Sequence, residues 1–201
     1  MTSVADIADD VPRCSWAVGT SPAMVRYHDT EWGVPTHDDR ELFELLILEG
    51  AQAGLSWRTI LERRDGYRRA FAGFEPGHVA ALGDDDVEAL LTDPGIIRNR
   101  AKVRSTVRNA AAFVELVAET GTFDRYLWSF AGGCPVLNRW TEPGQVPAIT
   151  ELGEALSKDL RKRGFTFVGP TIMYAYAQSA GLVMDHLTSC HRFGALTSPT
   201  G

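Results

Sequence analysis

Two cysteines and two histidines lie in pairs near the ends of the chain. Cys14 and His28 belong to the N-terminal part, and His186 and Cys190 stand four residues apart near the C-terminus. On one helix, residues four apart occupy the same face, as two ligands of one metal ion must. The four together form a Cys₂His₂ set that leaves no position for a reactive water, which favours a structural ion. Ordinary hydrogen-bonded histidines and small buried cysteines are the alternative, and spacing alone does not decide between the two.

Aromatic residues gather around a single acid in the N-terminal part. Trp16, Trp32 and Trp57 are three of the five tryptophans, and Tyr27 lies among them. Aromatic faces hold a planar base, and a carboxylate accepts hydrogen bonds from an amino group or favours a cation. Glu49 follows the apolar run LLIL, where an ionised side chain is costly unless it faces a polar cleft or a partner. The alternative is core packing for the tryptophans and a solvated helix end for Glu49.

The third group of candidate functional residues is a turn followed by a basic helix. In DPGIIRNRAKVR, Pro94 and Gly95 make a turn, and backbone NH groups at the start of the next helix can hold a phosphate. Five positive charges follow without an intervening acid: Arg98, Arg100, Lys102, Arg104 and Arg108. The pattern predicts a grip on a nucleic-acid backbone, although an ordinary helical hairpin with a solvated basic face gives the same pattern.

Helical patterns surround these residues. Acids near helix starts and glycines near helix ends mark the expected bounds. We expect helices over 38–53, 56–72, 84–91, 98–120, 123–130, 151–164 and 171–182, and a connecting loop over 131–147. The only strand candidate, FTFV at 165–168, is too short and isolated to support a sheet. The sequence therefore predicts an all-α fold.

We expect a single folded unit flanked by two flexible ends. The leader covers 1–12, a unit of two helical lobes covers 13–193 with a hairpin at about 84–108, and the tail covers 194–201.

The amino-acid composition and net charge exclude several classes of protein. Of the 201 residues, 44% are hydrophobic and 23% are charged, which excludes a disordered or collagen-like chain. The net charge of −6 makes a generally basic nucleic-acid binder improbable and leaves any attraction to DNA to a local patch. We find no apolar run long enough to cross a membrane and no signal peptide, so we expect a cytoplasmic protein. Three cysteines cannot all pair within one chain.

With these residues assembled, the chain resembles the DNA-3-methyladenine glycosylase I family of the helix-hairpin-helix superfamily. The resemblance extends from Arg13 to about Arg192. The motifs that carry it are RCSW, YHDTEWGVP, LFELLILEGAQAGLSW, DPGIIRNRAKV, LWSF, LSKDLRKRGFTFVGPTI and GLVMDH followed by Cys190. The hairpin departs from the superfamily pattern, since Pro94 precedes Gly95 and no second glycine follows two residues later.

This resemblance implies a helix-hairpin-helix DNA glycosylase fold and a bacterial base-excision repair enzyme associated with the nucleoid. Such an enzyme acts as a monomer on double-stranded DNA and releases 3-methyladenine as the free base. It holds one structural zinc ion on the residues that correspond to Cys14, His28, His186 and Cys190. The base pocket falls at Tyr27, Glu49 and Trp57, with Trp16 and Trp32 nearby. The expected DNA contacts are Gly95, Ile96, Arg98, Lys102 and Arg104.

The reaction that this resemblance implies requires little chemical assistance from the protein. Methylation at N3 leaves adenine cationic, so the glycosidic bond is weakened and the base departs neutral. The family lacks the superfamily's catalytic aspartate, and we expect Glu49 to recognise the base first and to be the one candidate catalytic group. Trp57 and Tyr27 supply π contacts to the cationic ring. No lysine is placed by a motif to form a Schiff base, which favours a monofunctional hydrolase. Leu55 is a candidate wedge for the vacated base stack.

Two other functions fit the same residues. A zinc-stapled DNA-binding module would recognise damage without cleaving, and a small-molecule enzyme would use the aromatic pocket alone. Base release from methylated DNA separates the first from a glycosylase. Binding that weakens steeply with salt counts against the second.

Overall fold

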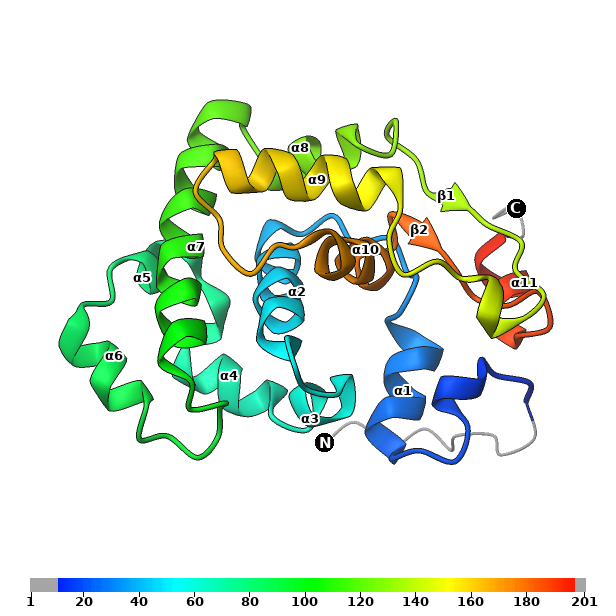
Figure 1. Ribbon diagram of the computed structural model, residues 1–201, viewed down its shortest axis with the longest axis horizontal. Coiled ribbons are helices and arrows are strands. Elements are labelled where there is room, and N and C mark those ends of the chain that lie inside the picture. The colour runs from blue at the N-terminus through cyan, green and yellow to red at the C-terminus, as the bar shows by residue number, and fades with distance from the viewer. Residues whose placement is uncertain (1–10, 198–201) are drawn as a thin grey trace.

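The computed structural model describes residues 11–197, and most of them are helical (Figure 1). The longer helices are α1 (Pro22–Thr30), α2 (Asp39–Gln52), α7 (Arg100–Thr120), α9 (Glu151–Lys162) and α10 (Pro170–Ser179). The shorter ones are α3 (Trp57–Leu61), α4 (Arg64–Ala70), α5 (Pro76–Ala80), α6 (Asp84–Leu90), α8 (Phe123–Ser129) and α11 (His191–Thr197). Three 3-10 helices are η1 (Ser15–Ala17), η2 (Ala72–Phe74) and η3 (Pro143–Gln145). The predicted, mainly helical character is confirmed.

A small parallel sheet departs from the all-α prediction. Strands β1 (Val136–Leu137) and β2 (Val183–Met184) pair side by side, and the amide of Val136 donates to the Leu182 carbonyl at 2.8 Å. Two residues are too few to show an alternating pattern, so these strands could not be predicted from the sequence. The candidate segment at 165–168 forms no strand. The pairing holds the loop after α8 against the C-terminal segment that carries His186.

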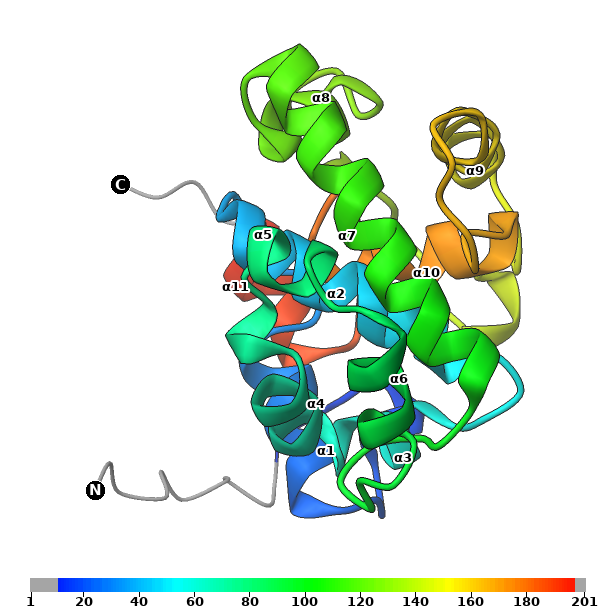
Figure 2. The same ribbon diagram turned by 90° about the vertical axis from the view of Figure 1, so that its left-hand side faces the viewer.

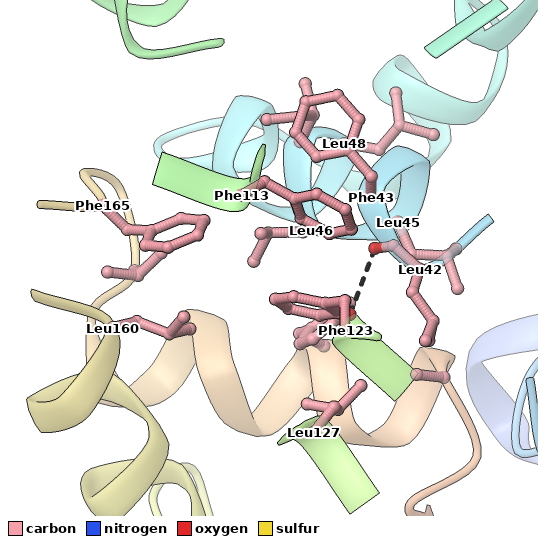
Figure 3. Close-up of a cluster of buried hydrophobic side chains, with 14 of the residues drawn as sticks. Leu42, Phe43, Leu45, Leu46, Leu48, Phe113, Phe123, Leu127, Leu160 and Phe165 are labelled. Atoms are coloured by element: carbon pink, nitrogen blue, oxygen red, sulfur yellow. Dashed lines mark hydrogen bonds between the residues drawn. The ribbon is translucent and has the colours of Figure 1, made fainter. Parts of the chain in front are cut away.

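Helix α2 runs through the middle of the molecule. Asp38 caps it, since its side chain accepts hydrogen bonds from the amides of Arg40 and Glu41. Every residue from 42 to 51 is buried. Figure 3 shows the apolar side chains of α2 surrounded by those of Phe113 on α7, Phe123 on α8, and Leu160 and Phe165 from α9 and the turn after it. A helix so enclosed holds whatever polar group it carries in a fixed place.

The helix expected over 56–72 is broken into α3 and α4. Ser56 caps α3 by accepting a hydrogen bond from the Thr59 amide at 3.2 Å, and α4 begins at Arg64 after a turn. Arg64 forms ion pairs with Glu31, just after α1, and with Glu44 on α2. The break therefore lets α4 dock against both neighbouring helices.

The α6–α7 hairpin docks on α4 through a close backbone approach. A Cβ on Gly66 would lie 2.1 Å from the Gly95 carbonyl oxygen, so only glycine fits at position 66. Tyr67 Oη accepts a hydrogen bond from the Ile97 amide at 3.3 Å, and Ile96 is buried. Asn99 caps α7 by accepting from the Lys102 amide. The hairpin turn lies at the same end of the molecule as α1, α3 and α4 (Figures 1 and 2).

The two ends of the described chain differ from expectation. Pro12, assigned to the leader, accepts a hydrogen bond from the His191 amide at 2.8 Å. Residues 194–197, assigned to the tail, belong to α11, while residues 1–10 and 198–201 lie outside the described residues. No helix within residues 11–197 is long and apolar enough to cross a membrane.

Candidate functional site

Cys14, His28, His186 and Cys190 lie together in a buried cluster. Their ligand atoms all lie within 4.8 Å of one another. Cys190 Sγ is 3.5 Å from both His28 Nε2 and His186 Nδ1, and Cys14 Sγ is 3.7 Å from His186 Nδ1. His186 and Cys190 do not share a helix, because Cys190 ends a turn and α11 begins one residue later. The turn nevertheless brings both side chains to the same point.

The cluster fits a tetrahedral zinc ion. Zinc bonds of about 2.3 Å to sulfur and 2.0–2.1 Å to nitrogen give separations of roughly 3.3–3.8 Å between neighbouring ligand atoms, close to the separations found. His28 Nδ1 donates to Asp29 at 2.7 Å, and His186 Nε2 donates to the Trp32 carbonyl at 2.9 Å. Each ring therefore turns its other nitrogen, an acceptor, into the cluster, where His28 Nε2 also accepts a hydrogen bond from the Cys14 amide at 3.3 Å.

Hydrogen bonding around the cluster also favours a thiolate. A side-chain hydrogen bond from the Cys14 thiol is the largest of the effects that hold the pKa of Cys190 well below its usual range. A deprotonated sulfur is the form that binds a metal. Burial raises the pKa of Asp29, but hydrogen bonds from Arg13, His28 and His191 outweigh it and keep this carboxylate ionised as the acceptor for His28.

An aromatic cavity of about 260 Å³ lies beside this cluster. All five residues predicted for base binding line it: Trp16, Tyr27, Trp32, Glu49 and Trp57. The ring centroids of Tyr27 and Trp57 are 5.2 Å apart, and Trp16 meets Trp32 edge-to-face at 5.1 Å. Because η1, α1, α2, α3 and α10 each supply part of the wall, the cavity depends on how these helices pack together. Its volume is below the range of roughly 300–1,000 Å³ for drug-sized ligands and suits a single planar base.

Glu49 is the one acid among the residues that line the cavity. Only 4% of its surface is exposed, and burial raises its pKa to about 8, against a smaller opposing effect of a hydrogen bond with Ser179. Burial also raises the pKa of Tyr27, and the nearby carboxylate of Glu49 raises it further. An empty cavity thus holds a carboxyl group that gains a charge when a positive or hydrogen-bond-donating ligand enters.

Gln178 also lines the cavity, and the sequence analysis did not select it. Its Nε2 donates to Asp185 Oδ2 at 2.7 Å. Asp185 is buried and accepts further hydrogen bonds from Asn138, Trp140 and Tyr174. A carboxylate only accepts, so the amide group of Gln178 must turn its NH₂ toward Asp185 and its oxygen away from it. The adjacent His186 was the only signal in the sequence that Asp185 lies near a site.

The predicted DNA contacts lie on the α6–α7 hairpin but differ in environment. Arg98 is exposed, whereas Ile96 is buried. The guanidinium of exposed Arg104 lies 3.3 Å from Asp84. The Gly95 amide donates to Asp93 Oδ1 at 2.7 Å. Lys102 Nζ donates to two carbonyl groups at the end of α2, and burial lowers its pKa.

The cavity has the size of a single base, aromatic walls and a buried carboxyl group, and a basic hairpin lies near it. These features are typical of helical proteins that recognise one nucleobase. The sequence profile described as methyladenine glycosylase matches residues 16–193. The chain belongs to this family.

Individual relatives agree over nearly their whole length. The DNA-3-methyladenine glycosylase 1 of Escherichia coli is 46% identical over 178 residues, which cover 89% of this chain and 95% of that protein. A crystal structure of a 3-methyladenine DNA glycosylase I matches with a TM-score of 0.87 and 44% identity, covering 90% of this chain and 98% of the other. The Staphylococcus aureus enzyme, solved for its recognition of 3-methyladenine, matches with a TM-score of 0.85 and 37% identity, covering 87% and 94%.

Proposed function

We propose that this protein is a base-excision repair glycosylase that extrudes 3-methyladenine from double-stranded DNA and hydrolyses its glycosidic bond. The observation that carries the proposal is Glu49, a buried carboxyl group facing an aromatic cavity of about 260 Å³. Relatives at 46% and 44% identity bear the name of this activity and support the proposal.

Recognition rests on charge and shape. While attached to the sugar, 3-methyladenine is cationic, and it favours the ionised form of Glu49 inside a cavity that otherwise favours the neutral form. Tyr27 and Trp57 supply π faces for the positive ring. The oxygen of Gln178 offers a second acceptor for the exocyclic amino group. An unmethylated base brings no positive charge, so it leaves Glu49 without a counter-ion.

Cleavage needs little from the protein because the departing base is neutral. The enzyme must extrude the nucleotide, at an unstacking cost of a few kcal/mol, and hold the base away from the stack. Glu49 recognises the base, and it is also the one acid on the cavity wall that can orient an attacking water. Among the described residues, no lysine lines the cavity to form a Schiff base, which supports monofunctional hydrolysis.

We propose that one zinc ion is held by Cys14, His28, His186 and Cys190. With four protein ligands the ion has no open position, so it cross-links the chain and takes no part in the reaction. Cys14 directly precedes η1 and His28 lies on α1, whereas His186 and Cys190 lie between β2 and α11 near the other end of the chain (Figure 1). The ion therefore stabilises the segments that supply Trp16, Tyr27 and Trp32 to the cavity.

The α6–α7 hairpin serves as a helix-hairpin-helix element that grips the DNA backbone. Within residues 11–197, no hydrogen bond engages the amides of Ile96 and Arg98, so we propose them as donors to a phosphate. The Gly95 turn, Arg98 and Arg104 complete the basic face, whereas the ammonium of Lys102, predicted as a DNA contact, donates to carbonyl groups at the end of α2. Leu55, 39% exposed between α2 and α3 at the same end, is the candidate wedge.

We expect a monomer that works in the bacterial cytoplasm on the nucleoid.

A base-release assay tests the proposal. Duplex DNA treated with a methylating agent is incubated with the protein, and free bases are separated by chromatography while DNA binding is followed by mobility shift. The proposal predicts free 3-methyladenine. A non-catalytic zinc-stapled DNA-binding module would retard the DNA without releasing a base, and that result would overturn the proposal.

A further inference from the structure

Lys102 is the basic residue of the hairpin helix whose charge turns inward. Its Nζ donates hydrogen bonds to the carbonyl oxygens of Ala51 at 2.8 Å and Ala53 at 2.7 Å. Arg98 and Arg104, on either side in the sequence, are exposed. Two of the three ammonium N–H groups of Lys102 are therefore used inside the protein.

The two carbonyls belong to the end of the helix that carries the base-binding acid. Ala51 lies in the last turn of α2, two residues beyond Glu49, and Ala53 follows the helix as its C-cap. The last carbonyls of a helix lack partners within the helix and carry a partial negative charge, which a lysine ammonium stabilises. Lys102 supplies this stabilising positive charge from α7, a different helix.

Past Ala53, the chain forms the turn that leads to α3. This turn contains Gly54, with φ of +74°, and Leu55, 39% exposed, before Trp57 opens α3 on the cavity wall. A single side chain from the hairpin thus holds the junction between the Glu49 helix and the turn that bears the candidate wedge.

We propose that Lys102 is a positioning residue that fixes the α2–α3 turn and the base cavity relative to the DNA-gripping hairpin. The inference rests on the proposed function. When the hairpin engages the backbone, this link sets how far Leu55 reaches toward the base stack and where the extruded base meets Glu49. Lys102 then acts on extrusion, whereas Arg98 and Arg104 act on binding.

The hairpin does not depend on Lys102 for its own attachment. The Gly66–Gly95 backbone contact, the bond from the Ile97 amide to Tyr67 and the buried Ile96 hold it to α4. Helix α2 is likewise held by the apolar core. Loss of the ammonium therefore loosens the link between two elements that each remain folded.

The experiment compares Lys102→Met with Arg104→Met, a matched loss of one charge from the same helix. Each variant is assayed for duplex binding over a range of salt, for affinity toward free 3-methyladenine, and for single-turnover base release at saturating enzyme. Extrusion is followed by the fluorescence of 2-aminopurine placed beside the lesion. Lys102→Arg retains donors that can reach the carbonyls and serves as the conservative variant.

For Lys102→Met we expect an unchanged salt slope and unchanged affinity for the free base. Base release at saturation should fall about tenfold or more, with loss of the 2-aminopurine signal, since misplacement of about 1 Å can cost a hundredfold. Lys102→Arg should recover a large part of the rate. Arg104→Met should lower the salt slope by about one, as expected for the loss of a phosphate contact.

Two results would overturn the inference. One is a salt slope lowered by about one in Lys102→Met with a wild-type saturated rate, which would make Lys102 a phosphate contact. The other is a wild-type slope and a wild-type rate. If Lys102→Met is unstable, Lys102→Gln carries the same comparison. Absence of base release by the wild type would instead refute the proposed function, so the two failures are distinguishable.

Discussion

In the proposed function, Glu49 determines what the cavity binds because its charge depends on the ligand. The side chain is buried among aromatic residues, and burial raises its pKa to about 8. At neutral pH the empty cavity therefore holds mostly the protonated acid. A ligand with a fixed positive charge favours the carboxylate, so binding of that ligand and release of the Glu49 proton are linked.

The first prediction concerns the pH dependence of binding. The ligand 3,9-dimethyladeninium carries the fixed charge that the lesion has in DNA. Its affinity should rise as the pH increases toward 8, by up to about tenfold per pH unit, and level off above that value, since the Glu49 proton no longer has to be displaced. Glu49→Gln should bind about ten- to a hundredfold more weakly at pH 8.5, with no such dependence. Calorimetry from pH 6 to 9 measures both, and a flat wild-type profile would remove the charge of Glu49 from recognition.

The second prediction concerns Gln178. Asp185 fixes the orientation of its amide, so the free oxygen can accept a hydrogen bond from the exocyclic amino group of adenine. Gln178→Leu should weaken 3-methyladenine binding by about two- to tenfold, the range for one neutral hydrogen bond. Binding of 3-methylpurine, which lacks the amino group, should change little. Equal losses for both ligands would show that Gln178 only shapes the cavity.

At the scale of elements, the active arrangement depends on how closely helices approach. The α6–α7 hairpin reaches its position because Gly66 on α4 has no side chain to keep the backbone of Gly95 away. The ion pairs of Arg64 with Glu31 and Glu44 fix α4 against α1 and α2, which carry Tyr27 and Glu49. The DNA grip and the base cavity therefore share one support.

Gly66→Ala tests that support. The added Cβ would lie 2.1 Å from the Gly95 carbonyl oxygen, so the hairpin must shift. We expect a loss of about 1–3 kcal/mol of stability and weaker duplex binding, with affinity for free 3-methyladenine preserved. Gly77→Ala on α5, where nothing lies within 4 Å, is the control; it should leave duplex binding unchanged and should not lower stability. Wild-type DNA affinity in Gly66→Ala would show that hairpin placement does not matter.

The sequence allowed prediction wherever a residue's chemistry is unusual for its surroundings. An acid after LLIL, paired Cys and His residues and a cluster of tryptophans marked the cavity and the metal cluster before any geometry was known. Features set by tertiary contact left no such mark. The break between α3 and α4 and the pairing of β1 with β2 depend on neighbours far along the chain. The run of basic residues after the Pro94–Gly95 turn predicted a phosphate contact for Lys102. The carbonyl groups that accept its hydrogen bonds are 49 and 51 residues away in the chain, so the sequence did not reveal them.

At the scale of the whole molecule, the cluster of Cys14, His28, His186 and Cys190 brings together the N- and C-terminal parts of the described chain. Cys14 and Cys190 are 2% and 4% exposed and pack with Leu187 in a small core apart from the main one. Trp16 and Trp32 pack against this small core and also line the base cavity. Loss of the ion should therefore affect both stability and base binding.

Metal removal is the fourth prediction. Purified protein should contain one zinc per chain, and Cys190→Ser should lower stability by about 2 kcal/mol or more, or roughly 4–8 °C in Tm, because the ion closes a loop of most of the chain. Cys134→Ser, at an exposed cysteine, should have the zinc content and Tm of the wild type. Elemental analysis measures the zinc content and thermal unfolding measures the Tm. A wild-type protein without zinc that has the same Tm as the zinc-loaded protein would refute the zinc site.

The most direct test of the account is single-turnover excision from a duplex that contains 3-methyladenine, with wild type and Glu49→Gln both at saturating concentration. The account predicts that the wild type releases 3-methyladenine and leaves undamaged adenine in place. Glu49→Gln should bind the same duplex with similar affinity but release the base about ten- to a hundredfold more slowly, through loss of a charged hydrogen bond. Release at the wild-type rate by Glu49→Gln, or duplex binding by the wild type without release, would contradict it.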